Sequence, residues 1–305
     1  MDLSINVGGI SFRNPVILAS GTAGFGRELN EYIDFSKIGG ISSKGLTCFP
    51  REGNPGCRVA ETMGGMLNSV GLQNPGVDEF LRTELGYMQS LDTNVIVNVA
   101  GHSVDDYIEM VEKLDAASDR IDILELNLSC PNVKAGCMSI GTDTEQIYTL
   151  ISNLRKRTKL PLWVKLTPNV TSISEMALAA ENAGADAVVL INTLLAMRID
   201  IRSKRPVLQN NTGGLSGPAV KPVAIRMVSE CYRSVSIPIV GLGGIATAED
   251  VLEFMIAGAS AIQVGTSTLI HPGVSQAIAE NLPACMKEYH VTSLKELTGS
   301  LRYYD

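Results

Sequence analysis

The sequence predicts an α/β fold, a (β/α)8 barrel of eight parallel strands. Short aliphatic or β-branched runs, bounded by Gly, Pro or Asn, recur along the 305 residues, and such runs are typical of strands buried on both faces. Helical patterns separate the runs, and this alternation favours parallel pairing through right-handed crossovers. The length also fits, because this barrel takes about 250 residues plus insertions.

Eight segments carry the strand pattern. They are residues 15–20, 39–44, 94–100, 122–129, 161–167, 187–193, 238–244 and 261–267.

Three helices between these segments have visible start signals. Ser103 is expected to cap a helix over residues 103–117, and Ser174 to open a second helix that ends near Gly184. Thr247 with Asp250 resembles a capping box and predicts a third helix start.

The remaining length lies in three places. Residues 7–12 (VGGISF) predict a short hairpin that closes the bottom of the barrel. Residues 45–76 and 194–217 are Gly-, Pro- or Asn-rich and are expected to be long loop insertions without strong elements. Both follow strand ends, at the face where such barrels build their sites. No linker or repeat is visible, so residues 1–305 are expected to form one domain.

Composition excludes several classes of protein. A formal net charge of −7 without a basic stripe argues against nucleic acid or an anionic membrane as partner. No apolar run reaches the roughly 18 residues of a membrane span, and the N-terminus has no secretory signal pattern. Six scattered cysteines without a CxxC pair argue against a metal or cluster and favour free thiols in a reducing compartment. The expectation is a soluble cytoplasmic protein.

The predicted strands end in small, amide or cationic residues. One such end is ordinary, but a full set is hard to explain as turns. Since the carboxyl ends of barrel strands meet at one rim, the residues there predict a binding site. They are Ser20-Gly21, Lys44-Gly45, Asn98, Asn127 to Cys130, Lys165, Asn192-Thr193, Gly243-Gly244 and Gly265-Thr266.

The last two strand ends predict a phosphate site. GLGGIATAED (241–250) and VGTS (264–267) place consecutive glycines and a helix start where backbone N–H groups can approach an anion. GLGGIA also matches a dinucleotide fingerprint, but that interpretation needs an acidic residue after the next strand, and VGTS has none. Plain turn glycines remain the other alternative.

Lysines and amides at the other strand ends suit an anionic, planar ligand. Lys44 and Lys165 either extend to solvent from a strand end or meet a phosphate, a carboxylate or a reduced isoalloxazine ring. An amide offers a donor and an acceptor in one plane, which matches a heterocycle with alternating N–H and C=O groups. The candidate amides are Asn68, Asn98, Asn127, Asn132 and Asn192.

Cys130 is the candidate general base. It follows the strand in IDILELNLSCPNVKAGC (121–137), and a thiol pKa of about 8.5 needs only a modest downward shift to serve as a base. The three histidines belong to no strand-end motif, and aspartates are missing there. A buried core cysteine is the alternative interpretation.

Several motifs together resemble the dihydroorotate dehydrogenase family, from Phe12 to Thr266. The combination of SCPN with VKAG looks like the class 1B catalytic subunit, whereas class 2 membrane-bound enzymes carry serine at the Cys130 position. The motifs are SKGLT (43–47), MLNSVGLQNPG (66–76), ELNLSCPNVKAG (125–136), VKLTPNV (164–170), LINT (190–193), GGLSGPA (213–219) and GLGGI (241–245).

The resemblance implies FMN as cofactor and the oxidation of (S)-dihydroorotate to orotate in de novo pyrimidine biosynthesis. Cys130 would remove the C5 proton while hydride passes from C6 to FMN N5. The residues implied to hold FMN are Ser20, Lys44, Gly45, Asn98, Asn127, Lys165, Ile191, Gly217, Gly243, Gly244, Gly265 and Thr266. Those implied to hold substrate are Lys44, Asn68, Ser69, Val70, Gly71, Leu72, Asn127, Asn192 and Thr193.

The resemblance also implies a partner subunit that carries FAD and a [2Fe–2S] cluster and passes electrons to NAD⁺. A homodimer of this chain flanked by two such partners would form a heterotetramer. One position departs from the family pattern, because Cys137 stands where a glycine is usual. If that position needs a positive φ, the cysteine would be strained by about 1 kcal/mol.

Three alternatives remain. A dihydropyrimidine dehydrogenase-like barrel would share the flavin and the thiol but take an uncharged ring, and Lys44 with NSVGL (68–72) favours the carboxylated substrate instead. A phosphate-binding isomerase or lyase without redox chemistry would need another acid–base pair. A non-catalytic scaffold would leave the Cys130 segment without a purpose.

Overall fold

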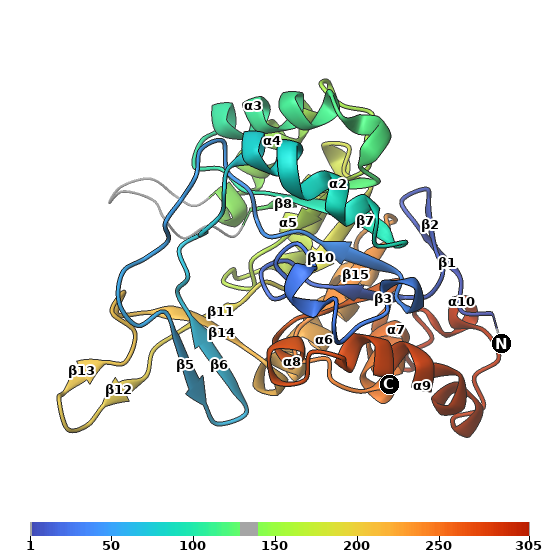
Figure 1. The fold of residues 1–305 in the computed structure, drawn as a ribbon. Coiled ribbons are helices and arrows are strands. Elements are labelled where there is room, and N and C mark those ends of the chain that lie inside the picture. The colour runs from blue at the N-terminus through green and yellow to red at the C-terminus, as the bar shows by residue number, and fades with distance from the viewer. Residues whose placement is uncertain (1, 129–139, 305) are drawn as a thin grey trace.

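Eight parallel strands close into a barrel in the computed structural model, which describes residues 2–128 and 140–304. Each strand lies within one of the eight predicted segments, so the predicted barrel is confirmed (Figure 1). In barrel order the strands are β10 (Ala187–Leu190), β15 (Ile239–Leu242), β16 (Ala261–Val264), β3 (Val16–Leu18), β4 (Gly40–Ser42), β7 (Asn94–Val99), β8 (Ile123–Asn127) and β9 (Leu162–Lys165).

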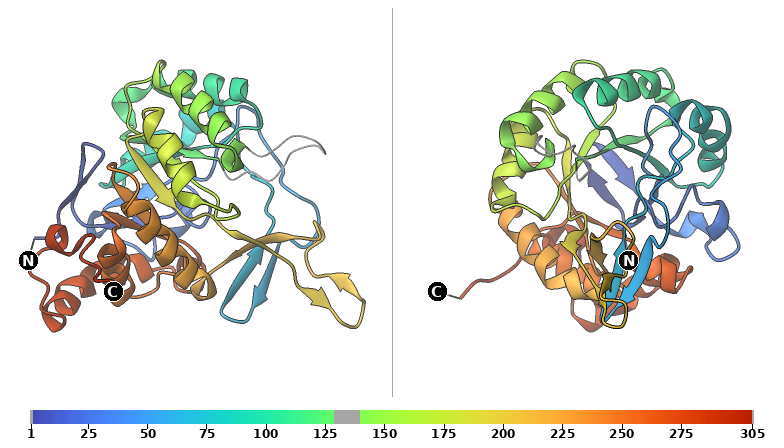
Figure 2. Two further views of the ribbon diagram at one scale, coloured as in Figure 1. Left: turned by 180° about the vertical axis from the view of Figure 1, so that it is seen from behind. Right: turned by 90° about the vertical axis from the view of Figure 1, so that its left-hand side faces the viewer.

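Helices surround the strands as a ring, which is clear in the end-on view of Figure 2. None of the helices in the described ranges is long and apolar enough to cross a membrane. The α-helices are α1 (Val77–Glu79), α2 (Leu85–Gln89), α3 (Val104–Asp115), α4 (Thr144–Arg155), α5 (Ile173–Asn182), α6 (Lys221–Tyr232), α7 (Ala248–Ala257), α8 (Thr266–Ile270), α9 (Val274–Glu288) and α10 (Leu294–Leu297). Short 3-10 helices are η1 (Arg27–Leu29), η2 (Phe35–Lys37), η4 (Ser118–Arg120), η5 (Ile140–Thr142) and η6 (Pro218–Val220), and a π-helical segment, η3 (Phe80–Glu84), joins α1 to α2.

Two of the three predicted helix starts are confirmed. The Ser103 hydroxyl accepts a hydrogen bond from the backbone N–H of Asp106 at the start of α3. Thr247 and Asp250 form a capping box at the start of α7, in which each side chain accepts from the other residue's backbone N–H.

The third predicted start, at Ser174, is wrong. Helix α5 begins at Ile173, and its N-cap is Ser172, whose hydroxyl accepts from the backbone N–H of Glu175. Ser172 has the extended backbone that a cap requires and the right spacing to Glu175. Ser174 therefore lies inside the first turn. The predicted end is confirmed, since the helix stops just before Gly184, whose φ is +98°.

The predicted hairpin at the barrel bottom is present. Strands β1 (Ile5–Val7) and β2 (Ile10–Phe12) pair antiparallel. The Phe12 ring packs against Trp163 inside the barrel, with ring centroids 5.8 Å apart, and both side chains are buried. The hairpin thus closes the end opposite the strand carboxyl termini (Figure 1).

The sequence predicted that the two insertions are loops without strong elements, and this prediction is wrong. They contribute β5 (Val59–Thr62), β6 (Gly65–Asn68), β11 (Leu194–Ala196) and β14 (Gly213–Ser216), which form one antiparallel sheet in the order β11-β14-β6-β5. Strands β12 (Ile199–Asp200) and β13 (Arg205–Pro206) form a further hairpin. The sheet projects from the carboxyl-end face of the barrel (Figures 1 and 2).

Side chains that point into the barrel change character along its axis. Near the bottom they are apolar, such as Ile96, Ile123 and Trp163. Two residues further along the same three strands, on the same face, the inward side chains are Asn98, Glu125 and Lys165, all buried. Ser42 on β4 and Gln263 on β16 are buried at the same level and bond to Glu125. These five residues form a polar layer directly below the barrel mouth.

Candidate active site at the carboxyl ends of the strands

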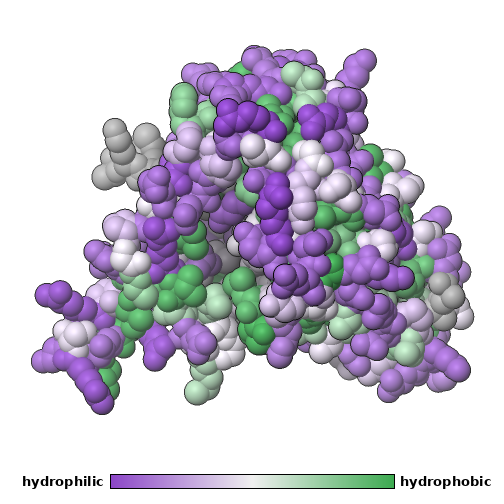
Figure 3. Space-filling view, in the orientation of Figure 1, coloured by the Kyte–Doolittle hydropathy of each residue, from purple (hydrophilic) through white to green (hydrophobic). Residues whose placement is uncertain are grey.

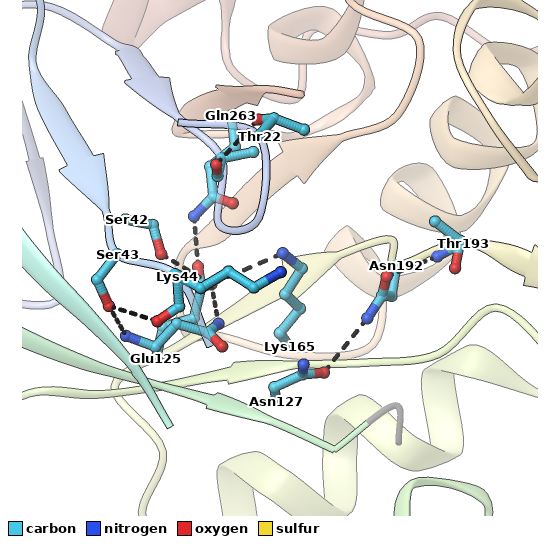
Figure 4. Close-up of polar contacts among 12 residues, drawn as sticks. Thr22, Ser42, Ser43, Lys44, Glu125, Asn127, Lys165, Asn192, Thr193 and Gln263 are labelled. Atoms are coloured by element: carbon cyan, nitrogen blue, oxygen red, sulfur yellow. Dashed lines mark hydrogen bonds and ion pairs between the residues drawn. The ribbon is translucent and has the colours of Figure 1, made fainter. Parts of the chain in front are cut away.

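Lys44 and Lys165 converge at the mouth of the barrel but differ in their partners (Figure 4). The Lys165 ammonium group lies 3.7 Å from the Glu125 carboxylate. The Lys44 ammonium group forms no hydrogen bond or ion pair with any residue in the ranges 2–128 and 140–304. Burial lowers the pKa of Lys44 below its usual value, and the positive charge of Lys165 lowers it further. The mouth therefore holds a cation that has no partner among the residues described, which suits an anionic ligand.

Glu125 is the centre of the polar layer. Its carboxylate accepts hydrogen bonds from Ser42 Oγ at 3.1 Å, from Asn98 Nδ2 at 2.6 Å and from Gln263 Nε2. Glu125 and Gln263 were not among the residues predicted from the sequence. The available signal was a charged residue at an inward position of the apolar run ILELN, because a buried charge requires paired donors.

Three of the predicted substrate residues, Asn127, Asn192 and Thr193, are linked by hydrogen bonds. Asn192 Nδ2 donates to Asn127 Oδ1 at 3.2 Å, and the backbone N–H of Thr193 donates to Asn192 Oδ1 at 2.8 Å. Tyr107 on α3 fixes the end of β8, because its hydroxyl donates to the Asn127 carbonyl at 2.6 Å. These contacts hold one polar edge of the mouth (Figure 4).

The predicted substrate segment 68–72 borders the mouth at both of its ends. Asn68 on β6 donates through Nδ2 to the Gly214 carbonyl at 3.4 Å, and a Cβ added at Gly214 would overlap the Thr193 side chain. At the other end, Leu72 Cδ2 lies 3.5 Å from the position of a Cβ on Gly45. Ser69, Val70 and Gly71 follow the end of β6 and connect these two points.

The predicted phosphate residues form a compact cluster. A Cβ added at Gly244 would lie 2.8 Å from the Gly217 carbonyl oxygen, and one added at Gly217 would lie 3.5 Å from Thr266 Cγ2. A Cβ at Gly243 would lie 3.6 Å from Ile191 Cγ1. Both Gly243 and Gly244 have positive φ, which favours glycine. Glycine is therefore favoured here both by the close packing of the chain on itself and by the positive φ.

The cluster continues to the lysines along β3. A Cβ added at Gly265 would meet nothing nearer than Ala19 Cβ, at 3.7 Å, so space is open there. Ser20 follows Ala19, and a Cβ at the next residue, Gly21, would lie 3.8 Å from Lys44 Nζ. The glycine cluster therefore lies next to the cationic mouth.

The start of α7 does not serve the phosphate cluster directly. The Asp250 carboxylate accepts from the backbone N–H groups of Ala246 and Thr247, at 2.8 and 2.9 Å, and from Lys221 Nζ at 2.6 Å. Burial alone would raise the pKa of Asp250, but these hydrogen bonds outweigh it and hold the pKa below its usual value. Helix α8, in contrast, begins at Thr266 within the cluster.

Cys130, Asn132 and Cys137 lie outside the described residues, as does the rest of segment 129–139. The other predicted residues of the site lie at the barrel mouth or in the insertion sheet beside it.

Fold and site together define a class: a (β/α)8 barrel with a glycine cluster beside a cationic, amide-lined mouth. Comparison with known proteins narrows this class. The family model described as dihydroorotate dehydrogenase matches residues 2–286. The chain therefore belongs to the dihydroorotate dehydrogenase family and is an oxidoreductase.

Curated relatives match over nearly the whole chain. A protein of Geotalea uraniireducens named dihydroorotate dehydrogenase B (NAD(+)), catalytic subunit, is 51% identical over 98% of both chains. A protein of the same name from Alkaliphilus metalliredigens is 49% identical over 99% of both chains. A solved structure of the dihydroorotate dehydrogenase of Eimeria tenella, in complex with ferulenol, superposes with a TM-score of 0.80 at 24% identity. It covers 98% of this chain and 88% of its own, which shows the shared fold.

Proposed function

We propose that this chain oxidises (S)-dihydroorotate to orotate with FMN as its cofactor. The observation that carries this proposal is the Lys44 ammonium group, partly buried beside Lys165 and without an anionic partner among the described residues. A carboxylated substrate would supply the missing negative charge. The curated names of the relatives point to the same substrate.

The residues around the mouth fit FMN. Asn98 Oδ1 and Gln263 Oε1 are buried acceptors without a hydrogen-bond partner within residues 2–128 and 140–304, and the two lysines suit a ring that gains negative charge. The glycine cluster, with open space at Gly265, suits a phosphate group. FMN would be held by Ser20, Lys44, Gly45, Asn98, Asn127, Lys165, Ile191, Gly217, Gly243, Gly244, Gly265 and Thr266. Bound there, FMN would supply the acceptor for the hydride from C6 of the substrate.

The substrate would be oriented by the chain's own amides and cation. Asn127, Asn192 and Thr193 already form one hydrogen-bonded edge, and segment 68–72 borders it through the insertion sheet. Lys44 would bind the substrate carboxylate. Cys130 would remove the proton from C5 as the general base; its position follows β8, whose end carries Asn127.

An uncharged dihydropyrimidine is the second candidate substrate. It shares the planar amide pattern but would leave Lys44 without a counter-charge, which favours dihydroorotate.

We further propose that electrons leave through a partner subunit that carries FAD and a [2Fe–2S] cluster, with NAD⁺ as acceptor. The relatives' names, which include NAD(+) and catalytic subunit, support a partner. Apolar side chains exposed on and beside the insertion strands support assembly with other chains, here a homodimer within a heterotetramer (Figure 3). They include Val59, Met63, Leu195, Met197, Ile199 and Ile201. The cytoplasm is the proposed location.

The first test is an anaerobic visible spectrum of the purified chain before and after addition of dihydroorotate. A yellow protein that bleaches is the expected result. A yellow protein that bleaches only with dihydrouracil would favour the uncharged substrate. A colourless protein that also fails to bind added FMN would contradict the proposal.

The general base is tested by Cys130→Ser. Flavin reduction by dihydroorotate should slow by at least about 100-fold at neutral pH, because general-base catalysis contributes on that order and an alcohol is a much weaker base than a thiol. Stopped-flow absorbance measures this rate. Cys137→Ser, which changes a thiol of the same segment, is the matched control. Its flavin should be reduced by dihydroorotate at the wild-type rate. Unchanged reduction in Cys130→Ser would remove Cys130 from its role.

A further inference from the structure

Glu125 occupies a place where a carboxylate is costly. It is fully buried in the barrel interior, one layer above the apolar side chains of Ile123 and Trp163. A buried charge persists only when donors and opposite charges surround it. The polar layer meets this condition, because it supplies hydrogen-bond donors and the Lys165 ammonium group to the carboxylate.

The carboxylate fixes the direction of two amides. An ionised carboxylate can only accept hydrogen bonds, so Asn98 and Gln263 must both turn their NH2 groups toward it, as they do. Their carbonyl oxygens, Asn98 Oδ1 and Gln263 Oε1, are consequently left buried and without a partner in the part of the chain that the structure describes. Asn98 Oδ1 lies 2.8 Å from the position of a Cβ on Gly45, at the barrel mouth. The site thus presents an acceptor at this point.

The same carboxylate holds Lys165 and offsets its charge. Glu125 is the acidic residue that pairs with Lys165, and Lys44 has no acidic partner among the described residues. The charges of Lys44, Lys165 and Glu125 therefore sum to +1, and without Glu125 the two lysines sum to +2. Because charges interact strongly in a buried site, this difference would be felt by any redox group bound above the layer.

We propose that Glu125 is the positioning residue of the cofactor site: it orients Asn98 as an acceptor for the ring N–H of FMN, holds Lys165, and lowers the reduction potential of the bound flavin. This inference rests on the proposed function. Glu125 acts through its neighbours, since Asn98 and Lys165 would touch the cofactor.

The test is Glu125→Gln, a change of equal size that removes the charge and lets the side chain donate. The FMN affinity of the apo protein is measured by quenching of flavin fluorescence, and the midpoint potential of bound FMN by reduction against redox dyes. Neither measurement uses dihydroorotate. We expect FMN binding to weaken about tenfold, since the Asn98 amide is no longer held in one direction, and the midpoint potential to become more positive. The midpoint potential distinguishes a positioning role of Glu125 from a merely structural one. A merely structural role would weaken FMN binding without making the midpoint potential more positive.

Glu112→Gln is the matched control, because it makes the same change at a residue of α3 that pairs with Arg157 at the surface. It should leave the affinity and the potential at wild-type values. If Glu125→Gln does not fold, the double variant Glu125→Gln with Lys165→Gln is compared with Lys165→Gln alone. The double variant removes both charges of the buried pair. The midpoint potential of its bound FMN should be more positive than that of Lys165→Gln.

An unchanged or more negative potential on loss of the Glu125 charge would overturn the inference. If wild-type protein binds FMN and is bleached by dihydroorotate while the Glu125 charge has no such effect, the inference alone fails. If the wild-type chain binds no FMN, the proposed function fails and the inference fails with it.

Discussion

Lys44 and Lys165 carry the same charge at one mouth, yet their contributions to folding differ. Lys165 is buried and paired with Glu125. Lys44 has no such partner in the described ranges, and burial lowers its pKa. Removing one partner of a buried pair leaves an uncompensated charge, whereas removing an unpaired buried cation also removes its desolvation cost. Equal charges at one site can therefore have opposite effects on stability.

This difference predicts the stability of two matched variants. Lys165→Met should reduce the free energy of unfolding of the apo protein by about 3 kcal/mol, because the Glu125 carboxylate remains buried. Lys44→Met should leave it within about 1 kcal/mol or raise it. Urea denaturation of the apo proteins at pH 7 measures both. Similar losses in the two variants would contradict the different environments assigned to the two lysines.

The pH dependence of Lys44→Met has a definite sign. Because the folded-state pKa of Lys44 lies below the unfolded value of 10.5, the charged lysine opposes folding at neutral pH. This opposition fades as the pH rises from the folded pKa toward 10.5. Any stability advantage of Lys44→Met over wild type should therefore shrink over that range.

At the residue scale, the sequence identified the strand-end residues but missed the polar layer beneath them. Lys44, Asn127, Asn192 and Thr193 were visible because each closes an apolar run. Glu125 lies in the middle of such a run, and its inward direction becomes clear only when the alternation along β8 is combined with the neighbouring strands. Its partners come from β4, β7, β9 and β16, and strand pairing rather than local sequence brings them together.

At the element scale, the turn between β15 and α7 depends on one carboxylate. Asp250 caps α7, pairs with Lys221 and binds the backbone of Ala246 and Thr247. The same turn carries Gly243 and Gly244 of the phosphate cluster. Asp250 thus connects helix capping to the shape of the predicted cofactor site.

Asp250→Asn is predicted to weaken this turn in a pH-dependent way. At pH 7 the variant should lose about 1–2 kcal/mol of unfolding free energy, since a charged cap and its ion pair are lost. The folded-state pKa of Asp250 is lower than the unfolded value of 3.8, so its contribution is present above pH 3.8 and lost as the pH falls through the folded pKa. Urea denaturation between pH 2 and 7 should show the two proteins converging in acid. A constant difference over this range would exclude the ionised carboxylate as the cause.

Local signals predicted some elements well and others poorly. Apolar runs located the barrel strands because both faces of each strand are buried. Capping chemistry identified the starts of α3 and α7, but two serines near α5 both fitted, and the serine with the correct spacing to Glu175 is the N-cap. The insertion strands gave no local signal, since β6 pairs with β14 across a large sequence separation. Their registry is set by that contact and not by either segment alone.

At the scale of the whole molecule, the barrel separates folding from ligand binding along its axis. At the bottom, Phe12 of the hairpin packs against Trp163, and the glycine cluster and lysines lie at the opposite end. Side chains at the bottom of such barrels contribute mainly to stability, whereas those at the carboxyl ends of strands form the site. The polar layer around Glu125 lies between these two regions. The whole chain as one domain remains a prediction.

Phe12→Ala tests this separation. Removing a buried aromatic ring should cost about 3–5 kcal/mol of unfolding free energy, because the cavity beside Trp163 cannot be refilled by the short hairpin. Ser11→Ala, at the exposed neighbouring position of the same strand, should change stability by less than about 0.5 kcal/mol. In conditions where both variants are folded by circular dichroism, FMN affinity should equal that of wild type. Weaker FMN binding by folded Phe12→Ala would mean that the apolar and polar layers are mechanically coupled, because a change at the bottom would then have displaced Glu125 and the side chains that it orients.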